Sequence, residues 1–202
     1  KWAAFQLRST DYAENRGRFD IWIAAIDGSA TRQLTTAPDS DTAPRWAPDS
    51  KTIYFLSTRS GSSQLWKIAI DGGEPQQVTS LPLDVSNVTL SPDGRTIAFS
   101  MEVFPGMSYQ DSAKKVAEKE ASKITGKLYD QLLYRHWDTW SDGRRNHLFV
   151  MSLDAGAEPR EADEKVAGVL ALDLVEVPVV HYPANDLVHV VGLGGSGRDE
   201  VE

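Results

Sequence analysis

The residues best suited to chemistry in this chain stand close together, between positions 134 and 145. This stretch contains one imidazole, three guanidinium groups and three aromatic rings. One interpretation is the lining of a pocket that binds peptide, formed by Arg135, His136, Trp137 and Trp140. The alternative is a strand that Trp137 and Trp140 anchor within a sheet.

Signatures of catalysis are missing elsewhere in the sequence. No Gly-x-Ser-x-Gly element occurs, and the nearest run, 194–197, has Arg198 where the second glycine belongs. The run 192–197 spells a dinucleotide fingerprint, but only five residues follow it, too few for the helix and strand of that unit. We expect no catalytic residue, cofactor or metal in this chain, since none of the histidines has metal-site spacing: His136, His147, His181 and His189.

A repeated turn indicates the strands that would position these residues. Pro92-Asp93-Gly94 separates an apolar run from Thr96-Ile97-Ala98-Phe99, which is rich in strand-forming residues. Pro48-Asp49-Ser50 precedes a similar run and lies 44 residues earlier. Each turn therefore predicts a β-hairpin.

A second landmark has the same offset. Trp22 and Trp66 stand 44 residues apart in similar strands, each followed by Asp-Gly, and a third copy runs from 148 to 156. A period of about 40–45 residues with several short strands is typical of propeller blades. We predict an all-β fold, a partial β-propeller of about three to four blades; the alternative is a β-sandwich with similar turns. The predicted core residues are Trp22, Trp46, Ile53, Phe55, Trp66, Ile97 and Phe99.

The first residues begin inside a hairpin. Lys1 to Phe5 align with Lys51 to Phe55, just after the turn, so the expected strand partner is not in the chain. We expect the chain to be a fragment of a longer protein.

The repeat is interrupted between residues 102 and 140, where we predict an inserted α-helical arm. Asp111 or Ser112 can cap a helix over residues 111–133, and small or apolar residues follow at steps of three and four. The stripe predicts that Ala117, Ile124 and Leu128 face inward. The stripe either packs on the propeller or docks on another domain.

Residues 161–202 do not match the repeat. After Arg160 the chain reads Glu161-Ala162-Asp163, where a Leu-Thr pair is expected. We divide the chain into a propeller portion, 1–160, and a divergent tail, 161–202. The tail either forms extra strands or is an unrelated end, such as a translated frameshift.

Composition excludes several classes of function. The net charge of −8 disfavours a nucleic-acid partner, and no stretch approaches the ~20 apolar residues of a membrane span. The absence of cysteine excludes disulfides and thiolate catalysis within this chain.

The turn repeats resemble the blades of TolB-like propellers. The segments Ala117–Lys123, Tyr129–Trp140 and Asp142–Val150 are similar to bacterial dipeptidyl aminopeptidase/acylaminoacyl-peptidase-like enzymes of the prolyl oligopeptidase family of serine peptidases. The resemblance covers about residues 1–160. The cellular location is left open, periplasmic or cytoplasmic in a bacterium.

The resemblance also implies a function. In that family a propeller precedes an α/β-hydrolase domain with the Ser, Asp and His triad, and it restricts access so that only short peptides reach the nucleophile. None of the triad maps onto this chain. We expect a non-catalytic propeller portion, with short peptides and a C-terminal hydrolase domain as partners; the alternative is a stand-alone TolB-like propeller that binds proteins.

Overall fold

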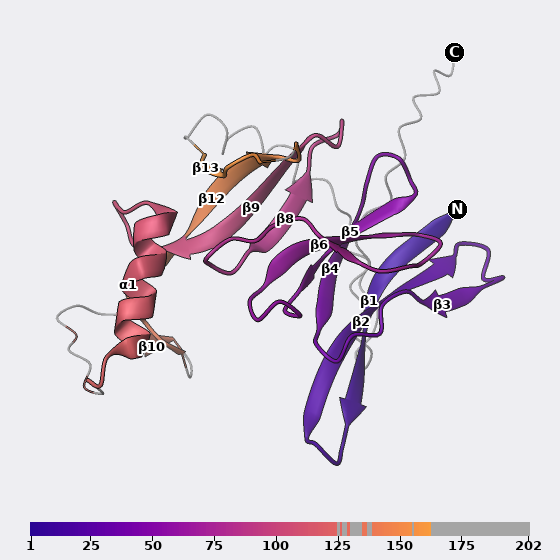
Figure 1. Cartoon of the computed structure of the whole chain (residues 1–202). Helices are drawn as coiled ribbons and strands as arrows, with labels where there is room; N and C mark the ends of the chain where they lie inside the picture. Colours follow the sequence, from indigo (N-terminus) through magenta and orange to yellow (C-terminus); the bar gives the residue numbers. More distant parts are fainter. Residues whose placement is uncertain (125, 127–128, 130–134, 137–138, 155, 163–202) are drawn as a thin grey trace.

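A computed structural model describes residues 1–124, 126, 129, 135–136, 139–154 and 156–162. Within them, three larger antiparallel sheets follow one another along the chain, a small two-stranded sheet lies in the insertion of the third, and one helix, α1, extends from that third sheet (Figure 1). The predicted all-β fold, a partial propeller with an inserted helix, is confirmed. We call the three sheets blades 1, 2 and 3.

Blade 2 has four strands in chain order, and blade 3 has the same order around the inserted segment. Blade 1 has three strands, which correspond to the second, third and fourth strands of the other two blades. The strands of blade 1 are β1 (Trp2–Asp11), β2 (Arg16–Ala25) and β3 (Thr31–Gln33). Those of blade 2 are β4 (Asp41–Trp46), β5 (Thr52–Ser57), β6 (Gln64–Ala69) and β7 (Gln76–Gln77). Those of blade 3 are β8 (Ser86–Leu90), β9 (Thr96–Val103), β12 (Arg145–Ser152) and β13 (Arg160–Glu161).

The predicted turns have the same geometry in blades 2 and 3. Ser50 N donates to Ala47 O at 3.0 Å, and Gly94 N donates to Ser91 O at 2.9 Å. Both Ser50 and Gly94 have positive φ, 54° and 68°. The carboxylate that precedes each of them accepts backbone N–H groups, from Lys51 and Thr52 in one blade and from Arg95 in the other. Local turn chemistry therefore explains why the motif recurs.

The first strands also share an irregularity that the sequence did not reveal. The pairing of β4 with β5 and of β8 with β9 shifts register at one point, and Ala43 and Asn87 there have φ of 50° and 51°. These two residues are 44 positions apart, so the bulge belongs to the repeat. Arg45 donates to Pro44 O and to Val88 O, the carbonyls that follow each bulge, and so links blade 2 to blade 3.

The core lies between the blades. One cluster joins blades 1 and 2 through Ile21, Ile23, Ile53 and Phe55, and another joins blades 2 and 3 around Phe99. The predicted core residues Ile53, Phe55, Ile97 and Phe99 are fully buried.

The three predicted core tryptophans are not fully buried. Trp22, Trp46 and Trp66 are intermediate in exposure, and Trp46 and Trp66 pack against the core cluster between blades 1 and 2. An indole is large enough to extend from the core to the rim of a sheet, where part of the ring stays accessible.

Blade 3 extends slightly past the predicted boundary at residue 160. Glu161 pairs with Phe149, and Ala162 N donates to Leu148 O at 2.8 Å, as Val78 N does to Leu65 O in blade 2. The unexpected sequence therefore still supplies the fourth strand. The rest of the tail, 163–202, lies outside the described residues.

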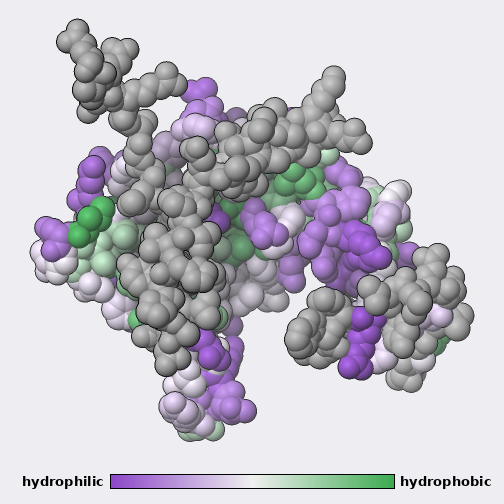
Figure 2. Space-filling view, turned by 180° about the vertical axis from the view of Figure 1, so that it is seen from behind, coloured by the Kyte–Doolittle hydropathy of each residue, from purple (hydrophilic) through white to green (hydrophobic). Residues whose placement is uncertain are grey.

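One face of the blades collects the connections between second and third strands. These are the hairpin tip at residues 12–15, the loop 58–63 and the insertion 104–144. We call this the arm face, because it carries α1 (Figure 1). The visible described surface is mostly hydrophilic, with separate small hydrophobic areas (Figure 2), as the net charge of −8 leads one to expect.

Candidate functional site

The arm begins with a well-capped helix. Helix α1 (Tyr109–Ala121) starts after Ser108, whose Oγ accepts from Asp111 N at 3.1 Å and donates to Asp111 Oδ2 at 2.8 Å. The predicted helix is confirmed over 111–121, but Asp111 and Ser112 are not its cap. Ser122 has an extended backbone and ends the helix, so residues 122–124 do not continue it. Much of the predicted second half, 125–133, lies outside the described residues.

The docked face of α1 differs from the predicted stripe. Tyr109, Ser112, Ala113 and Val116 recur at steps of three and four, and the three apolar ones pack on the core of blade 3. Ser112 is fully buried, and its Oγ accepts from Phe104 N at 3.0 Å.

The residues predicted to face inward lie elsewhere. Ala117 is exposed and Ile124 is 81% exposed, so their predicted inward positions are wrong. Leu128 lies outside the described residues. The large ring of Tyr109 sets the phase of the helix, because alanines offer little apolar area in comparison.

Tyr109 anchors the arm at its base. Its ring meets Phe149 edge-on at 6.1 Å between centroids, and its hydroxyl donates to Glu158 Oε2 at 2.6 Å. Burial and the hydrogen bond to Glu158 raise the pKa of Tyr109 to about 12, so the phenol is neutral under ordinary conditions.

Two lysines continue this attachment along α1. Lys115 Nζ and Lys119 Nζ lie 4.0 and 4.9 Å from the ring centroid of Phe104, and Lys119 also donates to Asp142 O at 2.9 Å. Both ends of the insertion are therefore tied to the helix.

The candidate peptide-binding residues lie farther along the arm. Strands β10 (Arg135–His136) and β11 (Thr139–Trp140) form a separate two-stranded sheet beside the end of α1 (Figure 1), rather than a strand of a blade. Arg135 pairs with Trp140 and His136 with Thr139, and the Arg135 guanidinium lies 5.4 Å from the Trp140 ring centroid. Tyr129 stacks on Trp140 at 5.8 Å.

The structure thus brings Arg135 and Trp140 together in a cationic and aromatic surface. Trp140 is 45% exposed and Arg135 is exposed as well, so both are accessible to a ligand. His136 shares their hairpin, and Trp137 lies outside the described residues. Their role in lining a substrate cavity stays a prediction.

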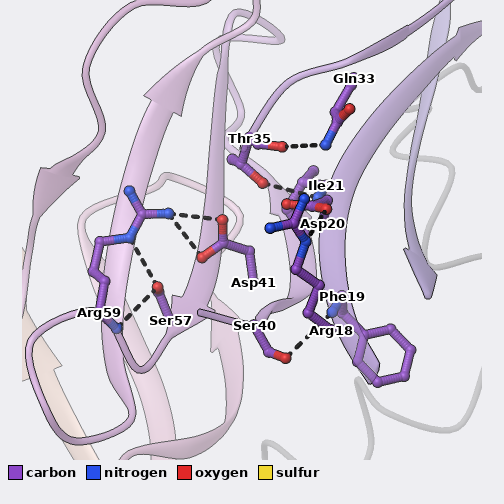
Figure 3. A network of polar contacts seen from close by, with 10 residues as sticks. All are labelled: Arg18, Phe19, Asp20, Ile21, Gln33, Thr35, Ser40, Asp41, Ser57 and Arg59. Atoms are coloured by element: carbon purple, nitrogen blue, oxygen red, sulfur yellow. Dashed lines mark hydrogen bonds and ion pairs between the residues drawn. The ribbon is translucent and has the colours of Figure 1, made fainter. Parts of the chain in front are cut away.

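The arm face also contains a buried charged network that was not predicted from the sequence (Figure 3). Asp41 is fully buried, and both its oxygens lie 2.7 Å from Arg59 Nη2. Arg59 Nε also donates to Ser57 Oγ at 2.9 Å. The Arg59 guanidinium lies 5.0 Å from the centroid of the Trp66 ring and 5.4 Å from that of Phe55.

Asp20 is the second buried carboxylate of this network. Its Oδ2 lies 3.5 Å from Arg18 Nε. Burial raises the pKa of Asp20, Arg18 lowers it, and the negative charge of Asp41 raises it further. The repeat contains a signal that could have identified both residues, because the positions 44 residues later hold the uncharged Gln64 and Val85.

Among the described residues, no three His, Asp or Glu side chains gather closely enough to hold a metal ion. The helix present in the described part is too short and too polar to cross a membrane.

Curated relatives match most of the chain. The dipeptidyl-peptidase 5 of Porphyromonas gingivalis is 35% identical over 140 residues, which are 69% of this chain and 20% of that protein. Dipeptidyl-peptidase 5 of Porphyromonas endodontalis is 28% identical over 153 residues, 76% of this chain and 21% of that protein. The chain therefore spans about a fifth of the length of these relatives.

Solved structures support the fold. The acylaminoacyl peptidase of Pyrococcus horikoshii aligns with a TM-score of 0.57 at 14% identity, covering 81% of this chain and 23% of that one. The AtxE2 isopeptidase aligns with a TM-score of 0.57 at 21% identity, covering 84% and 28%. The TolB beta propeller domain family matches residues 11–131. By this match and its repeated blades, the chain belongs to the TolB beta propeller domain family.

Proposed function

We propose that this chain is the non-catalytic propeller portion of a serine exopeptidase of the dipeptidyl or acylaminoacyl peptidase type. One observation carries the proposal: the 35% identity to a dipeptidyl-peptidase extends over 140 residues but occupies only 20% of that protein. The catalytic groups would then lie in another part of the enzyme, in an α/β-hydrolase domain that follows the propeller. This agrees with the absence of a Gly-x-Ser-x-Gly element here.

The arm face is the side from which we propose that the propeller restricts access. Helix α1 is fixed to blade 3 by Tyr109, while the hairpin with Arg135 and Trp140 is farther from that attachment. A guanidinium group beside an aromatic ring suits the carboxylate and apolar side chains of short peptides. The arm would border the route to the catalytic domain and admit short substrates.

The proposal includes a division of the chain. Residues 1–160, with the insertion at 102–140, form the propeller portion, and pairing continues to Ala162. Residues 161–202 are kept as the divergent tail, of which Glu161 and Ala162 pair with blade 3.

The test is an assay of the complete reading frame that contains this chain. We expect the purified product to hydrolyse a dipeptidyl chromogenic substrate and to be labelled by a serine-directed fluorophosphonate. The 202-residue chain, as the matched control, should do neither, because it carries no activated nucleophile. A complete product that fails to hydrolyse such substrates and takes up no label would refute the proposal.

A further inference from the structure

Asp20 occupies the same place in blade 1 as Gln64 in blade 2. The two residues are 44 positions apart, and each precedes a residue whose backbone N–H donates to a threonine hydroxyl. Ile21 N donates to Thr35 Oγ1 at 2.9 Å, and Leu65 N donates to Thr79 Oγ1 at 2.8 Å. The backbone around the two side chains is therefore equivalent.

Gln64 uses both ends of its neutral amide. Its Nε2 donates to Leu81 O and Leu83 O at 3.1 Å, and its Oε1 accepts from Leu81 N at 3.0 Å and from Thr79 Oγ1 at 2.9 Å. Gln64 thereby joins blade 2 to the segment that leads into blade 3. The residue is 1% exposed, so the site requires a partner for every polar atom.

Asp20 cannot reproduce these contacts when it is ionised, because a carboxylate only accepts hydrogen bonds. It is 3% exposed, and its Oδ1 accepts no hydrogen bond from the residues that the structure describes. The Gln33 amide donates to Thr35 O at 2.9 Å, and its hydrogen bonding also lowers the pKa of Asp20, but burial is the larger influence and raises it. A buried oxygen without a donor is costly, and more so when it is charged.

We propose that Asp20 makes the stability of the contact between blades 1 and 2 depend on pH. The contact is more stable when the carboxyl group of Asp20 is protonated and less stable when it is ionised. The charged groups that face it are Arg18 from its own strand, Asp41 from β4 and Arg59 from the loop 58–63 (Figure 3). Arg59 forms an ion pair with Asp41, whose two carboxylate oxygens lie 2.7 Å from its Nη2. The positive charge of Arg59 therefore offsets the negative charge of ionised Asp20 only in part.

Burial determines whether the contribution of Asp20 to stability rises or falls with pH. Burial is the largest influence on Asp20 and raises its pKa above the ordinary 3.8, so the folded chain binds this proton more tightly than the unfolded chain does. The contribution of Asp20 to stability therefore falls as pH rises from about 3.8 through the raised folded-state pKa, and the loss is complete above that value.

The experiment is urea unfolding of the full chain at several pH values from 4 to 7.5, for the wild type and for Asp20→Asn. We expect the Asp20→Asn midpoint to exceed the wild-type midpoint at pH 7.5, and the difference to shrink toward pH 4. Gln64→Glu should introduce the same pH dependence in blade 2. Asp39→Asn, at a more accessible carboxyl group, should leave the pH profile of the wild type unchanged.

A second measurement locates the effect. The amides of Ile21 and Leu34 donate to Thr35 Oγ1 and to Ile21 O, next to Asp20 in the chain. In the wild type, hydrogen exchange at these two amides should be faster at neutral than at acidic pH, after correction for the intrinsic rate. In Asp20→Asn the corrected rates should not change with pH. A midpoint difference that is independent of pH, or an Asp20→Asn chain less stable than the wild type at pH 7.5, overturns the proposal.

Discussion

At the residue scale, the core between blades 2 and 3 depends on Phe99. The ring is fully buried and stacks on Phe149 at 6.1 Å between centroids. Phe99→Ala should lower the free energy of unfolding by about 3–5 kcal/mol, because the cavity cannot close without moving both blades. Urea unfolding measures this loss. Tyr12→Ala, at a side chain that is 91% exposed, is the control and should change stability by less than about 0.5 kcal/mol.

The buried ion pair on the arm face gives a second prediction at this scale. Arg59→Ala leaves the Asp41 carboxylate buried without its partner, and should cost about 3–5 kcal/mol of unfolding free energy. The double variant Asp41→Asn/Arg59→Ala should recover part of that loss, since it also removes the buried charge. Arg16→Ala, which breaks an exposed pair with Asp39 at 3.9 Å, should cost less than about 1 kcal/mol. A double variant as unstable as Arg59→Ala alone would contradict this role for the pair.

Burial was predictable from the sequence for some residues and not for others. Phe99 and Phe55 could be placed in the core because they occupy equivalent positions of a repeat. Asp20 and Asp41 were not predicted to be buried, because a charged residue is ordinarily expected at the surface; only the uncharged Gln64 and Val85 at the equivalent positions indicate otherwise. The burial of the two aspartates depends on contacts between two blades.

At the element scale, the start of α1 depends on one side chain. Ser108→Ala removes the hydroxyl that accepts from Asp111 N, and should destabilise the chain by about 1 kcal/mol. Ser108→Asp, which retains a capping oxygen, should restore most of the loss. Thermal unfolding followed by circular dichroism at 222 nm compares the three chains. Equal stability of Ser108→Ala and the wild type would show that the cap is dispensable.

The docking of α1 has its own pH signature. The pKa of Tyr109 is raised from 10.0 to about 12, so the folded state favours the neutral phenol, and its contribution is lost as pH rises from about 10 through 12. Tyr109→Phe should therefore be less stable than the wild type at pH 8, by about 1–2 kcal/mol for a buried hydrogen bond to a carboxylate. The gap should narrow by pH 11.5. Urea unfolding at both pH values checks this, and a gap that stays constant contradicts the assignment.

The elements were predictable to different degrees. The hairpins follow from Pro-Asp turns between strand-forming residues, which is local chemistry. The helix was predictable from its polar, proline-free sequence, but its phase was not, because Tyr109 docks against Phe149, a residue 40 positions away. The bulges at Ala43 and Asn87 were not predictable as a repeat feature, because Asn tolerates a positive φ but Ala gives no local sign of one.

At the scale of the whole molecule, the period of 44 residues is sufficient to predict blades, because each blade buries its faces only against its neighbours. The candidate surface on the arm was only partly predictable. Arg135 and Trp140 were singled out by composition, and their pairing across a separate hairpin depends on the course of the insertion. The relatives extend well beyond the part that this chain matches, so the chemistry belongs to the larger protein in our proposal.

The most direct measurement compares substrate lengths in the complete enzyme before and after residues 122–141 are replaced by a short Gly-Ser linker. Helix α1 and its attachment through Tyr109 remain, so the blades keep their support. If the arm restricts access, the ratio of kcat/KM for a long peptide to kcat/KM for a dipeptidyl substrate should rise, with fluorophosphonate labelling unchanged. An unchanged ratio in a fully labelled enzyme would contradict the gating role of the propeller arm.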